Sequence, residues 1–310
     1  MTTQIDSFIE YLRLELNYSD CTVSAYRSDL RAWAQQLTAG KPETLNAADV
    51  AVTDLRLWLA EMSREGLAAS TIRRKVQSVR AFYRYLMCHH GATSNPASAL
   101  TLPKLPRRLP LYIRPEETSA MLDEADREAD TDFISARNAL ILELLYATGM
   151  RCSELTGLKD INVNTSSREL KVHGKRNKDR IIPIGPSLAS MIDGYRTMRE
   201  ASPATAQGLH SPAAPLLVSA KGAPLNRRTV YSVVNDAMSA AGIHAARLSP
   251  HVMRHSCATD MLNAGADLNS VKQLLGHASL ASTQVYTHIS NRELQLNYQH
   301  AHPRALKKGG

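Results

Sequence analysis

A proline-rich segment about one third of the way along the chain limits what the sequence can fold into. Residues 95–110 read NPASALTLPKLPRRLP and contain four prolines. Proline lacks the amide hydrogen that a helix interior needs, and it drives the preceding residue toward extended backbone. We therefore expect an interdomain linker over residues 101–113, which separates one domain over residues 1–100 from another over residues 114–310.

Four apolar stripes with helical spacing precede this linker. Apolar residues recur every three or four positions within residues 5–12, 23–37, 55–62 and 72–86. This spacing gathers them on one face of a helix, so the first domain is predicted to be helical. Ser70 is the predicted N-cap of the fourth helix.

The fourth helix and the linker carry basic residues with almost no acids between them. A solvated helix face usually mixes both signs, so a run of one sign favours contact with a polyanion over a plain solvated surface. The whole chain has a net charge of +8 and an isoelectric point of about 9.4, which favours nucleic acid as the partner. The residues predicted to contact DNA phosphates are Arg73, Arg74, Lys75, Arg80, Arg84, Lys104, Arg107 and Arg108.

The second domain mixes helical and strand patterns. Acids in the first turn after Pro115 mark one helix start, and an apolar helix ends at Gly149. Alternating apolar residues in 169–174 and 180–185 flank the polar loop 175–179, which predicts a β-hairpin. More helices are predicted near 186–199, 226–241, 250–264 and 267–275. The expected fold class is mainly α with a small β-hairpin or sheet in the second domain.

Several protein classes are disfavoured. The four cysteines are far apart and show no CxxC spacing, so neither a zinc site nor a disulfide framework is expected. The N-terminal sequence MTTQIDSFIEYL does not resemble a signal peptide, and no apolar run reaches membrane-spanning length. We expect a soluble cytoplasmic protein without a membrane partner.

Five segments contain candidate functional residues, and each has an ordinary structural interpretation. Arg151 could cap a helix C-terminus or pair with Glu154. His251 and Arg254, at i and i+3, could be a surface histidine and an ion-paired arginine. The segments are GMRCSEL (149–155), GKRNKDR (174–180), HVMRHS (251–256), LLGH (274–277) and VYTH (285–288).

The other candidates are also weak when taken singly. His277 could cap a helix that ends at Gly276, and Tyr286 is one of eleven tyrosines, for which packing is the default role. Lys175 lies just ahead of the proposed hairpin turn, and charge alone does not distinguish it from its basic neighbours Arg176, Lys178 and Arg180.

The ordered combination is far more specific than its members, and it resembles the tyrosine recombinase (phage integrase) family. That family carries Arg, a hairpin Lys, HxxR, His and Tyr in this order. The length, the two-domain layout and the segment HPRAL (302–306) resemble its Xer subgroup. Two departures are Arg176, where the family hairpin often has Gly, and Met253 in place of Leu. The matching positions are Arg151, Lys175, His251, Arg254, His277 and Tyr286.

The resemblance implies a role for each of these residues. Arg151 and Arg254 would clamp the nonbridging oxygens of a DNA phosphate, because a guanidinium binds oxyanions bidentately. Tyr286 would attack phosphorus, and His251 would take part in its proton transfer. Lys175, with Lys178 as the alternative, would protonate the leaving 5′ oxygen, and His277 would hydrogen-bond the phosphate. No cofactor and no metal would be needed.

The resemblance also implies an assembly. Four protomers would act on two double-stranded DNA target sites through a 3′-phosphotyrosyl intermediate and a Holliday junction. A second related recombinase and a septal DNA translocase are expected partners in the resolution of chromosome dimers. The C-terminal tail of each protomer would dock on a neighbour, with Leu294, Leu296 and Tyr298 as apolar anchors.

Other functions stay open at this point. The chain could be the integrase of a mobile element, a type IB topoisomerase, or a DNA-binding protein that kept the fold without catalysis. A metallohydrolase could use His251, His255 and His277, although HVMRH lacks the glutamate of the HExxH motif.

Overall fold

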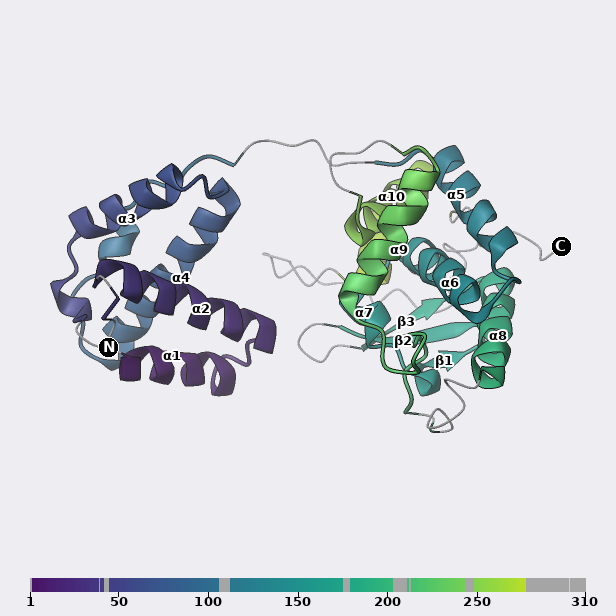
Figure 1. Ribbon diagram of the computed structural model, residues 1–310, viewed down its shortest axis with the longest axis horizontal. Helices are drawn as coiled ribbons and strands as arrows, with labels where there is room; N and C mark the ends of the chain where they lie inside the picture. The colour runs from purple at the N-terminus through teal and green to yellow at the C-terminus, as the bar shows by residue number, and fades with distance from the viewer. Residues whose placement is uncertain are drawn as a thin grey trace. The chain divides into compact units, whose positions relative to one another are not determined.

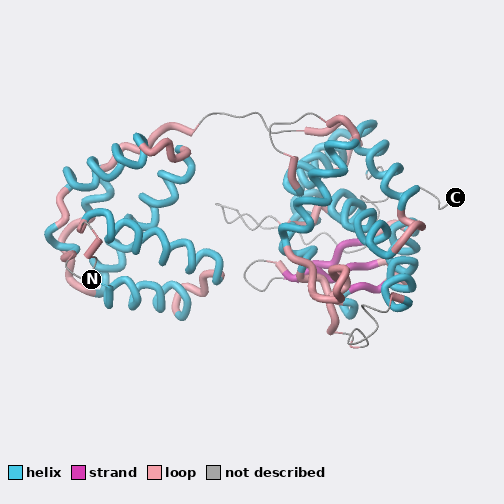
Figure 2. The backbone as a smooth tube through the Cα atoms, viewed as in Figure 1, coloured by secondary structure: helices cyan, strands magenta, loops and turns pink. Residues whose placement is uncertain are grey.

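The structure is a computed structural model, and it describes residues 2–38, 40–41, 45–105, 112–174, 179–202, 211, 213–243, 248–276 and 301. The chain divides into two compact units, Met1–Arg108 and Leu109–Gly310 (Figure 1). Their boundary falls within the segment 101–113. The strands of the described part of the chain all belong to the second unit (Figure 2).

The first unit is helical, as predicted, and the apolar stripes form its core. Phe8, Trp33 and Phe82 come from three different helices, and the ring centroid of Phe82 lies 5.6 Å from that of Phe8 and 6.2 Å from that of Trp33. All three are almost completely buried. The α-helices are α1 (Thr2–Leu14), α2 (Asp20–Leu37), α3 (Val52–Arg64) and α4 (Ala69–His89), and the 3-10 turns are η2 (Ala47–Asp49) and η3 (Pro96–Ala99).

The prediction that Ser70 caps the last of these helices is wrong. Helix α4 begins at Ala69, and its N-cap is Ala68, whose side chain makes no capping hydrogen bond. Ser70 therefore lies inside the first turn. The chain enters this helix from extended backbone at Ala68, two residues earlier than the serine signal suggested.

Two arginines of α4 hold the segment that follows the helix. Arg80 donates from Nε to the carbonyl oxygen of Ala97 (2.9 Å) and from Nη2 to that of Leu100 (2.8 Å). Arg73 donates from Nη1 to the carbonyl oxygen of Pro103 (3.2 Å). The carbonyl oxygen of Ala97 also accepts the backbone N–H of Leu100 (3.4 Å), so the arginines add side-chain donors to the carbonyls of this short segment. The start of the linker is thus fastened to the helix by side chains that were predicted to contact DNA.

The remaining basic residues of this set differ in their surroundings. Arg74 pairs with the buried carboxylate of Asp29, which also accepts a hydrogen bond from Ser78 Oγ (2.9 Å). Lys75 is half-buried, whereas Arg84 and Lys104 are exposed. Arg107 and Arg108 lie outside the described residues. DNA contact by this set stays a prediction.

The second unit is built around helix α6 (Phe133–Thr148). The side chain of Asp132 caps its first turn, and Gly149 ends it in the left-handed conformation at φ +57°. Most residues between these caps are buried, and the helix packs against five other helices of the unit. The other α-helices are α5 (Pro115–Glu128), α7 (Cys152–Thr156), α8 (Pro186–Ala201), α9 (Arg227–Ala240), α10 (Pro250–Asn263) and α11 (Leu268–Leu275).

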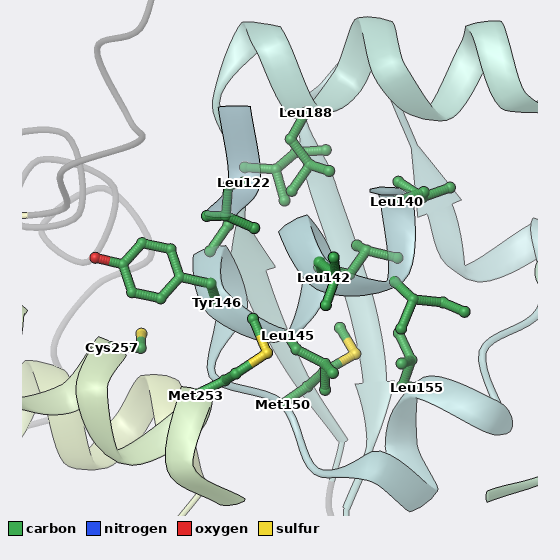
Figure 3. Packing of buried hydrophobic residues seen from close by; sticks show 14 of the residues in the cluster. Leu122, Leu140, Leu142, Leu145, Tyr146, Met150, Leu155, Leu188, Met253 and Cys257 are labelled. Atoms are coloured by element: carbon green, nitrogen blue, oxygen red, sulfur yellow. The ribbon is translucent and has the colours of Figure 1, made fainter. Parts of the chain in front are cut away.

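The core of this unit lies on both sides of α6. Figure 3 shows Leu145 and Tyr146 of α6 close to Met253 and Cys257 of α10, and Leu188 of α8 above them. All five residues are buried. Because α10 packs against α6, its residues 251–254 lie near the C-terminal end of α6.

A small antiparallel sheet confirms the predicted hairpin. Its strands are ordered β1-β2-β3, and Leu170 faces Ile182 while His173 faces Asp179 in the β2–β3 register. Residues 175–178 of the hairpin loop lie outside the described residues. The strands are β1 (Val163–Asn164), β2 (Glu169–His173) and β3 (Asp179–Pro183), preceded by the 3-10 turn η4 (Asp160–Asn162).

The segment that leads into the second unit is bound to α10. Tyr112 donates its hydroxyl to Asp260 Oδ1 (2.7 Å), and the backbone N–H of Ile113 donates to Ser256 Oγ (3.0 Å). The other Asp260 oxygen accepts from Tyr146 of α6 (2.8 Å). Burial raises the pKa of Asp260, although the hydrogen bonds from Tyr112 and Tyr146 act to lower it. One buried carboxylate thus joins the chain start of the unit to two helices.

Within the described residues, no helix is long and apolar enough to cross a membrane.

We predict that Arg80→Met destabilises the first unit by about 2 kcal/mol, because it removes charged hydrogen bonds to partly buried carbonyls. The only two tryptophans, Trp33 and Trp58, lie in this unit, so tryptophan fluorescence during urea unfolding reports on it selectively. Arg84→Met, on the exposed side of the same helix, is the matched control. Equal stabilities of the two variants would contradict the prediction.

Candidate active site

Arg151 lies between α6 and α7, as the N-cap residue of α7. Its backbone N–H donates to Glu154 Oε2 (2.8 Å), and its Nη1 donates to Glu154 Oε1 (2.8 Å). The predicted local pair with Glu154 is therefore present. Its Nη2 donates to the carbonyl oxygen of Gly276 (3.1 Å), so the carbonyl that it caps belongs to the end of another helix.

Arg254 reaches the same region from α10. It is only 9% exposed, and it donates from Nη1 to the carbonyl oxygen of Gly149 and from Nη2 to that of Leu275 (2.6 Å). Burial, together with the nearby charge of Arg151, lowers the pKa of Arg254 to about 10. The guanidinium therefore stays charged at neutral pH while much of its water has been replaced by carbonyl oxygens.

Arg180 of strand β3 is a third arginine in this cluster. Its Nε donates to the carbonyl oxygen of Leu274 (2.8 Å), and its Nη1 and Nη2 donate to Glu154 Oε1 (3.0 Å) and Oε2 (2.8 Å). From the sequence alone, Arg180 is one of four equivalent basic residues of the hairpin. Strand alternation could have separated it, because residues two apart share a face and Ile182 is completely buried.

The three arginines converge on the last carbonyls of α11. The oxygens of Leu274, Leu275 and Gly276 each accept a hydrogen bond from a different arginine. A helix C-terminus exposes unpaired carbonyls and the negative end of the helix dipole, so it attracts cations. Gly276 ends this helix at φ +63°, and the next residue in the chain is His277.

Glu154 is the carboxylate of the cluster. Its side chain is 4% exposed, and burial alone would raise its pKa. The hydrogen bonds from Arg180 and Arg151 outweigh that effect, so the pKa of Glu154 is lowered. Two of the three guanidiniums, those of Arg151 and Arg180, bind this carboxylate. Because the cluster holds three arginines and one carboxylate, it keeps a net positive charge suited to a phosphate.

His251 is the second residue of α10 and is exposed, one turn before the buried Arg254. The structure thus brings Arg151 and Arg254 together and places His251 on the same helix as Arg254. Lys175, His277 and Tyr286 lie outside the described residues, as do the tail residues Leu294, Leu296 and Tyr298. Among the residues described, no group of three or more His, Cys, Asp or Glu could hold a metal ion.

The turn at Gly149 is the tightest part of the cluster. A Cβ at this position would lie 2.5 Å from Leu275 Cδ2 and 3.4 Å from Cys257 Sγ. Leu275 carries one of the carbonyls that Arg254 binds. A methyl group at Gly149 would therefore require the buried side chain of Leu275 to move, and glycine lets α6 and α11 pack closely here without that shift.

We predict that Gly149→Ala destabilises the protein more than Gly242→Ala does. Both glycines have positive φ, but a Cβ at Gly242 would meet nothing within 4 Å. The steric conflict at Gly149 adds about 1–3 kcal/mol to the backbone strain that both variants share. Urea unfolding followed by circular dichroism measures the difference, and a smaller loss at Gly149 than at Gly242 would refute the expected close packing.

We also predict a specific acid sensitivity. Because the pKa of Glu154 is lower in the folded state than in the unfolded chain, its ionisation stabilises the fold above the ordinary glutamate pKa. That contribution is lost as the pH falls through the lowered value. Glu154→Gln should therefore reduce the free energy of unfolding at pH 7 and weaken its dependence on pH below about 4.5. Parallel pH profiles for the two proteins would exclude this role.

Two family models match the chain. The phage integrase family model covers residues 112–293, and the phage integrase N-terminal SAM-like domain covers residues 5–90. Among solved structures, the crystal structure of XerH site-specific recombinase bound to palindromic difH substrate has a TM-score of 0.68 at 20% identity. It covers 97% of this chain and 81% of that chain, and the likeness confirms the predicted two-domain fold.

Curated relatives match over nearly the whole length. A tyrosine recombinase XerC of Bacillus pumilus is 36% identical over 305 residues, 97% of this chain and 96% of the relative. A tyrosine recombinase XerD of Chlorobaculum tepidum is 35% identical over 303 residues, again 97% and 96%. The family predicted from the ordered residues is confirmed: the chain belongs to the phage integrase family and is a tyrosine site-specific recombinase.

Proposed function

We propose that the arginine cluster is the phosphate-binding half of the active site and that Tyr286 is its nucleophile. The observation that carries this proposal is the convergence of Arg151 and Arg254 on the carbonyls of Gly276 and Leu275. These carbonyls immediately precede the segment that holds His277 and Tyr286. A guanidinium has five N–H donors, so both arginines keep donors for a scissile phosphate while their positions are set.

The proposed reaction needs no metal and no cofactor. The Tyr286 oxygen attacks phosphorus as the bond to the 5′ oxygen breaks, which leaves a 3′-phosphotyrosine and a free 5′ hydroxyl. Arg151 and Arg254 stabilise the charge of the pentacovalent transition state. His251 takes the phenolic proton, His277 hydrogen-bonds the phosphate, and Lys175 (or Lys178 across the same loop) protonates the leaving oxygen.

The proposed partner is double-stranded DNA carrying a specific site. The predicted division of labour assigns DNA binding to residues 1–100 and catalysis to residues 114–310, joined by the linker 101–113. In the first domain the exposed Arg84 is well placed for phosphate contact, whereas Arg73 and Arg80 already bind backbone carbonyls. In the second, the net positive charge of the cluster supports the same partner.

The proposed setting is the cytoplasm, where four protomers pair two sites and resolve chromosome dimers through a Holliday junction. Similarity to relatives named XerC and to one named XerD supports this Xer-type role. A second related recombinase would supply half of the tetramer, and a septal DNA translocase would activate it. Integration of a mobile element is the competing role, and footprinting on DNA from the host chromosome terminus separates the two.

We predict that Tyr286→Phe still binds DNA but forms no covalent adduct. The purified protein first selects its site from random-sequence duplexes, and a nicked suicide duplex with that site then traps the adduct on a denaturing gel. Wild type and the control Tyr298→Phe should both form the adduct, and EDTA should not reduce it. An adduct with Tyr286→Phe would move the nucleophile elsewhere, and EDTA sensitivity would favour a metallohydrolase.

A further inference from the structure

Arg180 makes three hydrogen bonds within the cluster, unlike a typical solvent-exposed arginine of a hairpin. It binds both oxygens of the buried Glu154 carboxylate and the carbonyl of Leu274, and its side chain is 11% exposed. Its guanidinium also lies directly against Gly276, where a Cβ would be 3.0 Å from Nη1. One side chain of β3 therefore contacts α7 and the end of α11 together.

The two arginines on Glu154 divide its oxygens evenly. Each oxygen accepts one hydrogen bond from Arg180 and one from Arg151. Arg180 lies in a bidentate arrangement, whereas Arg151 uses one side-chain nitrogen on Glu154 and directs Nη2 to Gly276. A bidentate guanidinium adds both energy and geometric specificity to its pair with a carboxylate, so we take Arg180 as the main counter-ion of Glu154.

This arrangement decides how much of the Arg151 charge remains for a substrate. A buried carboxylate with a single arginine partner would form a neutral pair with it. With Arg180 present, Glu154 is compensated from the hairpin side, and the positive charge of Arg151 is left to act with that of Arg254. The position of Arg151 and its charge are thereby supplied by two different residues.

We propose that Arg180 is a positioning residue for DNA cleavage: it neutralises Glu154 so that Arg151 can bind the scissile phosphate, and it fixes the α11 terminus from which residue 277 follows. The proposal rests on the proposed role of Arg151. Arg180 itself does not touch the phosphate in this scheme. Lysine cannot replace it, because a lysine ammonium lacks the planar fork that spans both carboxylate oxygens.

The test measures the single-turnover rate of covalent adduct formation on the suicide duplex at saturating protein. Arg180→Met should lower the rate about 100-fold, the size expected when an electrostatic contributor is lost, and Arg180→Lys should not restore it. Arg196→Met is the matched control, because Arg196 also joins a carboxylate, Asp160, to backbone carbonyls of the same unit. Circular dichroism and DNA binding are measured for every variant, and the rates are compared for folded, bound protein.

Two further measurements distinguish positioning from a loss of stability. In a Glu154→Gln background, Arg180→Met should cost less than about threefold, because no carboxylate charge is left to compensate. On a duplex with a neutral methylphosphonate at the cleavage position, the loss caused by Arg180→Met should shrink, since less cationic charge is needed there. A loss of equal size in both backgrounds and on both substrates would overturn the proposal.

The outcome for wild type separates this inference from the proposed function. If wild type forms no adduct on the selected site, the proposed function fails. If wild type forms the adduct and Arg180→Met matches the Arg196→Met control, the proposed function stands and the role of Arg180 is refuted. A large loss in Arg180→Met that Arg180→Lys fully rescues would also refute it, because a point charge would then be sufficient.

Discussion

The hydrogen bonds between three guanidiniums and the last carbonyls of α11 are the constraint on which the candidate site depends. Arg151, Arg180 and Arg254 come from the turn after α6, from β3 and from α10. Of these elements, α10 alone directly precedes α11 in the sequence, and the other two are distant from it. The helix end is a fixed array of acceptors, and it orders three long side chains before any ligand arrives. Because the side chains are already ordered, less conformational entropy is lost when a ligand binds. Such preorganisation is what electrostatic stabilisation of a transition state requires.

Much of the fold follows from periodicity. Apolar residues at helical spacing predicted the four helices of the first unit, and strand alternation predicted β2 and β3. Helix α7 and strand β1, with five and two residues, are too short to show a period. The residue pattern that gave the family lies in a fixed order along the chain and needs no geometry. The part played by Arg180 could not be read in the same way, because its partners Glu154 and Leu274 are 26 and 94 residues away.

The basic helix α4 shows the limit of arguments from charge alone. Five basic residues on one helix predicted a phosphate-binding surface, yet Arg73, Arg74 and Arg80 have partners within their own unit. A sequence counts charges, but it does not show which of them are already satisfied by backbone carbonyls or by a buried carboxylate such as Asp29. The same residue type therefore serves the internal structure at one turn of the helix and faces solvent at Arg84.

The attachment of Tyr112 and Ile113 to α10 has a mechanical consequence. A load that reaches the second unit through its leading segment is delivered to Asp260 and Ser256, on the helix that also carries His251 and Arg254. A pulling force on Tyr112 and Ile113 would therefore be transmitted directly to helix α10. Because Tyr146 of α6 binds the same carboxylate, α10 is also held to the helix that ends at Thr148, three residues before Arg151. The two arginines proposed to bind the phosphate, Arg151 and Arg254, are thus positioned by the same pair of helices, α6 and α10, to which Tyr112 is attached through Asp260.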